Sequence, residues 1–384
     1  MLIELASALP GAEKSLLGLP LFWQCIDRLA QAHRDGNHLL QIDAHCCAWL
    51  LRNRDRISAP SVAVIQEIQR SARTNAAALS RIGERIVVTE RSHGAPRVAG
   101  ESIEVPCTWF STTDRVGSTM LIAEDVKSDV ILYQRLAEAL AHTQGLGFRV
   151  RITGGGGSRI GPELAAQTTN ASPAIAIVDT DRTHPGGAIG TTCRAAWRSA
   201  QDVGARCDPP PSANMQTGHE EAKCLGRLVI LNARELENLI PSSAWEEIPI
   251  SPLPELLRLN ETEWVWLDRK AGILCMDTLG HTEQARYLRA ALNKSGKAAP
   301  CQPSGACHRA EEARCGAKDS GKAPAKLLDG LPNGALLRLA GVLPQWRHET
   351  IRERLLPSGS GELARVGSII MAWGLAGVST ARAA

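Results

Sequence analysis

The sequence predicts an α/β fold built on a parallel sheet, and two observations lead to this prediction. Four short apolar runs have the length of buried strands, at 120–123, 148–152, 174–178 and 228–231. Helical segments lie between and after these runs, the clearest being the amphipathic stretch 130–141. Strands that alternate with helices favour parallel pairing through right-handed crossovers.

The segments on either side of this α/β pattern have a different texture. Residues 1–85 lack strand alternation and carry apolar residues at helical spacing, whereas 86–88 and 103–105 look like strands. We therefore expect three regions, which are a mainly helical N-terminal region at 1–115, the α/β domain at 116–245 and an α-rich C-terminal region at 246–384.

The composition is ordinary for a globular protein. The chain has 384 residues, of which 44% are hydrophobic and 22% charged, and its net charge of +3 provides no strong basic field. Neither a signal peptide nor an apolar stretch long enough to cross a membrane is apparent. We expect a cytoplasmic protein without a membrane partner.

Two aspartates directly follow the third apolar run. Asp179 and Asp181 lie where open α/β sheets place their ligands, beyond the carboxyl ends of the strands. Two carboxylates so close together repel each other unless a proton or a cation intervenes. The simplest cation is a hard divalent metal, Mg²⁺ (or Mn²⁺), bound through carboxylate oxygens.

Further acidic residues follow the first and fourth runs. If the sheet is parallel, their side chains reach the same edge as Asp179, and the metal ligands we expect are Glu124, Asp125, Asp179, Asp181, Glu235 and Glu237. Asp129 opens the helix after the first run, where an acidic residue also serves as a cap or complements the helix dipole.

The order and spacing of these motifs resemble a TOPRIM domain, the metal-binding nuclease module of topoisomerases, primases and OLD nucleases. The resemblance rests on residues 121–124, the glycine turn 154–157 and the Asp-x-Asp of 177–182. Residues 234–239 and 268–272 are similar to elements of OLD-like TOPRIM proteins in bacterial antiphage systems. Asp125 stands where the family usually has Gly, so either Glu124 or Asp125 is the first metal ligand.

The resemblance implies a Rossmann-like TOPRIM domain and a Mg²⁺-dependent nuclease acting on DNA or tRNA. The catalytic residues it implies are Glu124, Asp179, Asp181 and Lys270. We expect the substrate phosphates to be bound by Gly155, Gly156, Arg159 and Arg182. A flexible turn is the alternative explanation for the glycines. The resemblance also implies an antiviral defence effector, held silent by a regulatory protein partner or by homo-oligomerisation.

Two other functions fit parts of the sequence. Residues 175–183 fit the signature of haloacid-dehalogenase-like phosphatases, in which Asp179 would be the nucleophile and Asp181 the general acid/base. The substitution at Asp125 is also compatible with a non-catalytic subunit that has a degenerate TOPRIM domain.

A cluster of soft ligands in the C-terminal region suggests a structural Zn²⁺ site. Its candidate ligands within 301–315 are Cys301, Cys307, His308 and Cys315. Their spacing is not that of a zinc knuckle, and Cys275 is a possible substitute ligand. Free thiols in a polar loop are the alternative.

Overall fold

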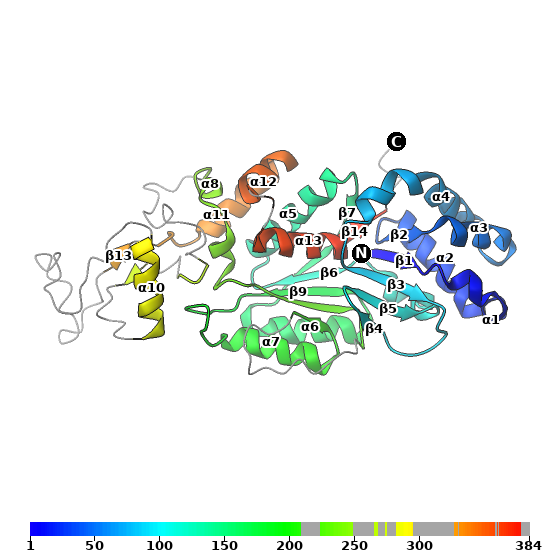
Figure 1. The fold of residues 1–384 in the computed structure, drawn as a ribbon, viewed down its shortest axis with the longest axis horizontal. Helices are drawn as coiled ribbons and strands as arrows, with labels where there is room; N and C mark the ends of the chain where they lie inside the picture. The colour runs from blue at the N-terminus through cyan, green and yellow to red at the C-terminus, as the bar shows by residue number, and fades with distance from the viewer. Residues whose placement is uncertain are drawn as a thin grey trace, which may run out of the picture.

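The computed structural model contains two mostly parallel sheets that lie end to end, with helices on their faces (Figure 1). It describes residues 1–208, 223–248, 265–267, 273–274, 282–294, 326–328, 330–357, 359 and 361–377. The α/β class expected from the sequence is therefore confirmed. In these ranges no helix combines the length and the apolar character needed to span a membrane.

The N-terminal sheet has the strand order β2-β1-β3-β5-β4. Its strands are β1 (Leu2–Leu5), β2 (Leu39–Ile42), β3 (Arg85–Thr89), β4 (Arg97–Ala99) and β5 (Ser102–Pro106). All neighbours pair in parallel except β4, which runs antiparallel to β5 at the edge.

Helices cover this sheet, and polar side chains begin two of them. They are η1 (Leu9–Ala12), α1 (Glu13–Leu17), α2 (Pro20–Arg34), α3 (Ala44–Arg52), η2 (Arg54–Arg56) and α4 (Ala59–Leu79). Asp43 caps α3 by accepting a hydrogen bond from the Cys46 N–H at 2.8 Å, and Ser58 caps α4. Two short 3-10 turns, η3 (Trp109–Ser111) and η4 (Thr113–Val116), lead out of the region.

The prediction of a mainly helical N-terminal region was therefore wrong in one respect, because the helices surround a sheet. The strands near 86–88 and 103–105 were expected, but β1 and β2 were not. Both are four-residue, largely buried apolar runs. Parallel strands covered on both faces lose the alternation that marks a half-exposed strand, so their sequence resembles a helical core segment.

The second sheet is entirely parallel, with the order β10-β11-β9-β6-β8. Its strands are β6 (Met120–Ala123), β8 (Arg151–Gly154), β9 (Ala174–Val178), β10 (Arg206–Cys207) and β11 (Gly226–Ile230). The expected runs thus form strands, although β8 and β11 are displaced by a few residues from the predicted positions.

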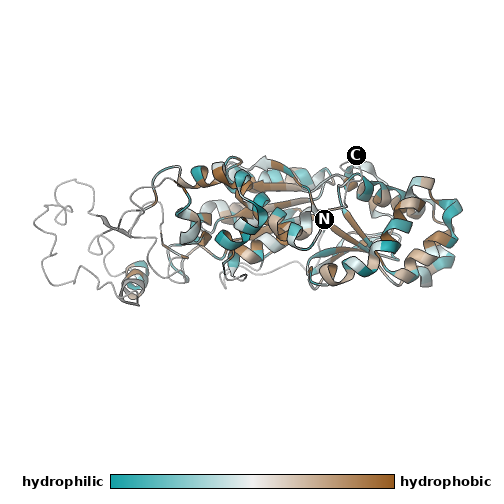
Figure 2. Cartoon of the chain, turned by 90° about the horizontal axis from the view of Figure 1, so that it is seen from above, coloured by the Kyte–Doolittle hydropathy of each residue, from teal (hydrophilic) through white to brown (hydrophobic). Residues whose placement is uncertain are grey.

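Alternate residues of β6 and β9 face two different layers of helices (Figure 1). Leu121, Ile175 and Ile177 pack in the core that contains α5 (Asp129–Thr143) and α13 (Glu362–Gly374). Ile122 and Ala176 pack in the core that contains α6 (Ile160–Thr169) and α7 (Thr191–Asp202). Figure 2 shows the apolar strands enclosed between helices with hydrophilic outer surfaces.

The elements that follow β11 include helices that pack against α5. The described elements are η6 (Leu236–Leu239), α8 (Ser242–Trp245), β12 (Ile273–Leu274), α10 (Glu283–Lys294), β13 (Lys326–Leu328), α11 (Ala335–Val342), η10 (Leu343–Gln345), α12 (His348–Leu355) and β14 (Leu375–Ala376). β14 pairs antiparallel with β7 (Gly147–Phe148) in a separate two-stranded sheet, which joins the end of α13 to the segment that precedes β8.

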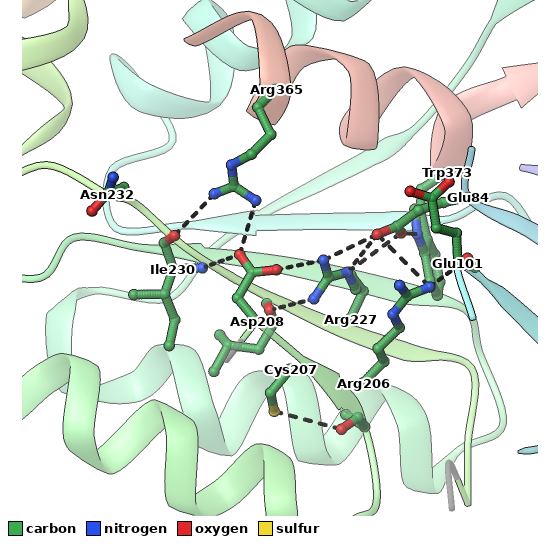
Figure 3. A network of polar contacts seen from close by, with 12 residues as sticks. Glu84, Glu101, Arg206, Cys207, Asp208, Arg227, Ile230, Asn232, Arg365 and Trp373 are labelled. Carbon is green, nitrogen blue, oxygen red and sulfur yellow. Dashed lines mark hydrogen bonds and ion pairs between the residues drawn. The ribbon is translucent and has the colours of Figure 1, made fainter. Parts of the chain in front are cut away.

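A buried network of charges connects the two sheets (Figure 3). The Glu84 carboxylate, next to β3, accepts hydrogen bonds from Arg227 of β11 at 3.1 Å and from the Trp373 indole of α13 at 2.7 Å. Asp208, after β10, pairs with Arg227 and with Arg365 of α13. Residues from four distant segments therefore meet around one set of ion pairs.

Candidate functional site

The second sheet has a topological switch point between β6 and β9. The chain leaves β6 through α5 to reach β8 on one side, and it returns across β6 through α6 to reach β9 on the other (Figure 1). The loops that follow β6 and β9 therefore lead to opposite faces of the sheet, towards α5 and α7. Open α/β sheets bind their ligands at such a point.

Two of the predicted residues follow the strands that flank this switch point. Glu124 comes directly after β6 and Asp179 directly after β9, and the two strands are hydrogen-bonded neighbours. The pKa of Asp179 is raised well above its usual value, first by burial and then by the charges of Glu124, Asp129, Glu237 and Glu235. Carboxylates from three segments therefore act on one another, as the sequence predicted.

The same charges affect residues on the first two turns of α5. Burial and the charges of Glu237 and Asp125 raise the pKa of Asp129 to about 6, although hydrogen bonds from Ser128 and Asp125 oppose this. Tyr133 is buried one turn later, and its pKa is raised by burial and then by Asp179 and Asp129. The sequence analysis did not identify Tyr133, although its spacing of four residues from Asp129 places both on one helix face.

The turn after β6 distinguishes Glu124 from Asp125. The Lys127 N–H donates to the Asp125 carboxylate at 2.8 Å, and the Asp125 N–H donates to Asp129 at 3.2 Å. Asp125 is exposed and organises its own turn, whereas Glu124 is the residue whose charge acts on Asp179. The structure thus favours Glu124 as the first ligand at this edge.

The glycine loop after β8 is attached to this turn through its backbone. The Gly155 N–H donates to the Ala123 carbonyl at 2.7 Å, and the Gly156 N–H donates to the Glu124 carbonyl at 3.1 Å. A Cβ on Gly155 would lie 2.3 Å from Ile160 Cγ1, and Gly156 has a left-handed φ of 51°. The backbone conformation and the close packing of the loop are therefore sufficient to require glycine at positions 155 and 156. A phosphate-binding role for Gly155 and Gly156 stays a prediction.

Asp181 lies in a turn that its backbone and Gly190 define. Its φ of 55° is left-handed, and its N–H donates to the Arg234 carbonyl at 2.9 Å. A Cβ on Gly190 would lie 2.3 Å from the Asp181 Oδ2, so this carboxylate lies against the residue that precedes α7. The largest charge effects on the pKa of Asp179 come from Glu124, Asp129, Glu237 and Glu235, and Asp181 is not among them.

Cys193, in the first turn of α7, is buried and feels the charges of both Asp181 and Asp179. Burial raises its pKa to about 12, with further increases from Asp181 and Asp179. No motif in the sequence identified this cysteine.

The two glutamates after β11 have different roles. Glu235 begins η6 in a capping box, in which its N–H donates to the Asn238 side chain at 3.2 Å. Glu237 is only 5% exposed, and its charge acts on both Asp179 and Asp129. Glu237 is thus the more central of the two.

The expected substrate-binding arginines differ in exposure. Arg159 is exposed at the end of η5 (Gly157–Arg159), on the same edge as Glu124. Arg182 is only 3% exposed, donates to the Pro185 carbonyl at 3.0 Å and lies 5.8 Å from the Trp266 ring centroid. These contacts hold the loop after β9 and leave little of Arg182 for a substrate. In the same loop, His184 lies 3.6 Å from Glu283 of α10.

The gathered carboxylates do not form a closed coordination shell. Within the described residues, no three His, Cys, Asp or Glu side chains lie close enough together to enclose a metal ion. Mg²⁺ usually keeps several waters and takes one or two protein carboxylates plus substrate phosphates, so an open set suits it better than a cage. Lys270 and the proposed zinc ligands Cys301, Cys307, His308 and Cys315 lie outside the described residues.

Comparisons of this chain with models of protein families, with curated proteins and with solved structures found no match.

Proposed function

We propose that this chain is a Mg²⁺-dependent nuclease (Mn²⁺ being the alternative metal) whose TOPRIM-like domain spans 116–245. The observation that carries the proposal is the crowding of negative charge around Asp179 at the switch point. In the described part of the chain, Asp179 and Asp129 have no Lys, Arg or His within ion-pairing distance, although Asp129 accepts hydrogen bonds. Such carboxylates are stabilised when a hard cation binds between them.

Glu124, Asp179 and Glu237 are the residues that would hold the metal. When bound, a divalent ion neutralises charge on a phosphodiester and lowers the pKa of a bound water. The protein supplies the position of the carboxylates, because Glu124 and Asp179 extend from adjacent strands and Asp129 begins α5. The N-terminal dipole of α5 also favours negative charge in its first turn.

Exposed arginines on the same edge support a nucleic-acid substrate. Arg159 precedes α6 and Arg194 lies in the first turn of α7, and both are exposed. Such side chains suit phosphates of either DNA or tRNA. Arg149 and Arg151, by contrast, lie at the opposite edge, where β8 begins. The proposed role in antiviral defence, with a regulatory partner or a second copy of the chain, rests on the resemblance to OLD-like proteins.

The test compares cleavage of labelled plasmid DNA and labelled tRNA in Mg²⁺, in Mn²⁺ and in EDTA. Cleavage is expected only with metal, and Asp179→Asn or Glu237→Gln should reduce its rate by at least about 100-fold, as removal of a key electrostatic group does elsewhere. Asp202→Asn is the matched control, because Asp202 is an exposed carboxylate at the far end of α7. Equal inertness with metal and with EDTA would remove the nuclease proposal.

Assays on the wild type and on Asp179→Asn also distinguish the nuclease from two alternative functions. A haloacid-dehalogenase-like phosphatase needs Asp179 ionised as a nucleophile, which the crowding of carboxylates opposes. Hydrolysis of para-nitrophenyl phosphate that is lost in Asp179→Asn would favour that alternative. A non-catalytic subunit with a degenerate domain should bind no Mg²⁺ at millimolar concentration in calorimetry.

A further inference from the structure

A second candidate site lies at the opposite edge of the same sheet. A groove of about 770 Å³ opens where β6, β8 and β9 begin. It is formed by the end of the N-terminal region, by the first residue of β8 and by the turn after α6, and its lining residues lie at 112–115, 117, 151 and 169–172. β9 has five residues, so this edge is about 16 Å from the Glu124 edge. The groove is thus separate from the carboxylate site.

The turn after α6 gives one wall of the groove its shape. The Ser172 N–H donates to the Gln167 carbonyl at 3.1 Å, and the Ala171 N–H donates to the Thr168 carbonyl at 3.0 Å. This Schellman pattern satisfies carbonyls at the end of α6, and it places Ala171 at a left-handed φ of 60°. Asn170 and Ser172 then line the groove with polar side chains.

Two arginines line the groove and are held in place by neutral groups. Arg115 donates to the Trp109 carbonyl at 2.9 Å, and its guanidinium lies 3.9 Å from the Trp109 ring centroid. Arg151 donates to the Ser118 carbonyl at 3.1 Å. Among the described residues, neither arginine has a carboxylate within 4.0 Å.

The contrast with the buried network is informative. Arg227 and Arg365 are each paired with carboxylates. Arg115 is partly buried, and desolvation lowers its pKa without a carboxylate within 4.0 Å among the described residues to offset the effect. A partly buried guanidinium without a counter-ion is costly, and an anion in the groove would offset that cost. Guanidinium groups match phosphate oxygens particularly well, because their N–H donors form a planar fork.

We propose that this groove binds a small phosphorylated molecule of nucleotide size, with its phosphate held by Arg115 and Arg151. The volume lies within the range of about 300–1,000 Å³ that is typical of small-molecule sites. A bare phosphate ion would fill little of it. Apart from the exposed Asp114 carboxylate, the remaining lining is rich in neutral hydrogen-bonding groups suited to a sugar or a base, namely those of Thr112, Thr113, Thr169, Asn170 and Ser172. This proposal does not depend on nuclease activity.

The test is calorimetric titration of the full chain with adenosine monophosphate, inorganic phosphate, adenosine and a short single-stranded oligonucleotide. Adenosine monophosphate should bind, inorganic phosphate should bind more weakly and adenosine should not bind. Arg151→Gln should weaken binding by at least about tenfold, the usual effect of removing a charge-assisted hydrogen bond. Arg149→Gln is the matched control, because Arg149 is close in sequence but does not line the groove.

Several results would overturn the proposal. They are no binding of either phosphate-bearing probe at millimolar concentration, equal binding of adenosine, or affinities that Arg151→Gln leaves unchanged. Tight binding of the oligonucleotide alone, lost in Arg151→Gln, would instead assign the groove to a polynucleotide. Arg151 is exposed, so its variant should fold, and Arg115→Lys provides a second test because it keeps the charge but loses the planar fork.

Discussion

The connection between the two sheets should depend strongly on Glu84. We expect Glu84→Gln to lower the free energy of unfolding by about 3 kcal/mol. Removing one partner of a buried ion pair costs about 3–5 kcal/mol, because the other charge is left uncompensated. Arg227, the main partner, is 4% exposed and keeps its pairing with Asp208, which places the loss at the lower end of that range.

Urea denaturation followed by far-ultraviolet circular dichroism measures this loss. With a denaturant slope of about 3 kcal/mol per molar urea, the midpoint should fall by about 1 M. Glu90→Gln is the matched control, since Glu90 is an exposed carboxylate just beyond β3, and surface changes usually stay within about 0.5 kcal/mol.

A double-mutant cycle tests whether the loss arises from the Glu84–Arg227 contact itself. Arg227→Met alone should also destabilise, and the two changes together should cost clearly less than their sum. A loss below about 1 kcal/mol for Glu84→Gln would refute the reasoning, as would strictly additive effects in the cycle. Either result would mean that the packing of the strands, rather than their charges, holds the sheets together.

Three other changes test separate features. Asp179→Asn should raise the melting temperature near neutral pH in EDTA, by the equivalent of about 1–2 kcal/mol, because the neutral amide removes crowded charge. It should also remove the stabilisation that Mg²⁺ gives the wild type, and a lower melting temperature would contradict charge crowding. Ala171→Gly should stabilise by about 1 kcal/mol in urea, because glycine adopts its left-handed conformation without strain, and no gain would contradict that reasoning. Burial lowers the pKa of His33 to about 4 from 6.5, so the unfolded chain takes up a proton first and stability should fall as pH drops through that interval. His33→Gln should lessen this fall, which is at most about 3 kcal/mol for one such group, and an equally steep fall would exclude His33 as a cause.

The sequence predicted the strands of the second sheet better than those of the first. β6 and β9 are apolar runs followed directly by acidic residues, and β11 contains a third apolar run, so these strands are visible in the sequence. β1 and β2 are only four residues long, each with one polar residue among buried apolar ones, and β10 has only two residues. The pairing of β14 with β7 joins segments far apart in the chain, which no local pattern reveals.

Which residues lie at the candidate site could be predicted from the sequence, but the conformation of the loop after β9 could not. Parallel strands place Glu124 and Asp179 at one edge, and this follows from the alternation of strands and helices. The conformation of Asp181 depends on a left-handed backbone and on a hydrogen bond from its N–H to the Arg234 carbonyl, both of which are set by tertiary structure. The burial of Arg182 likewise depends on Trp266, which is distant in sequence.

The protein treats buried charge in two opposite ways. In the network around Glu84, the carboxylates share guanidinium groups, so burial is compensated. At the switch point, by contrast, burial and neighbouring negative charges raise the pKa of both Asp179 and Asp129. Crowded carboxylates whose pKa values are raised are more typical of functional sites than of structural ones. This crowding of carboxylates is the reason why we propose that this edge of the sheet binds a cation from solution.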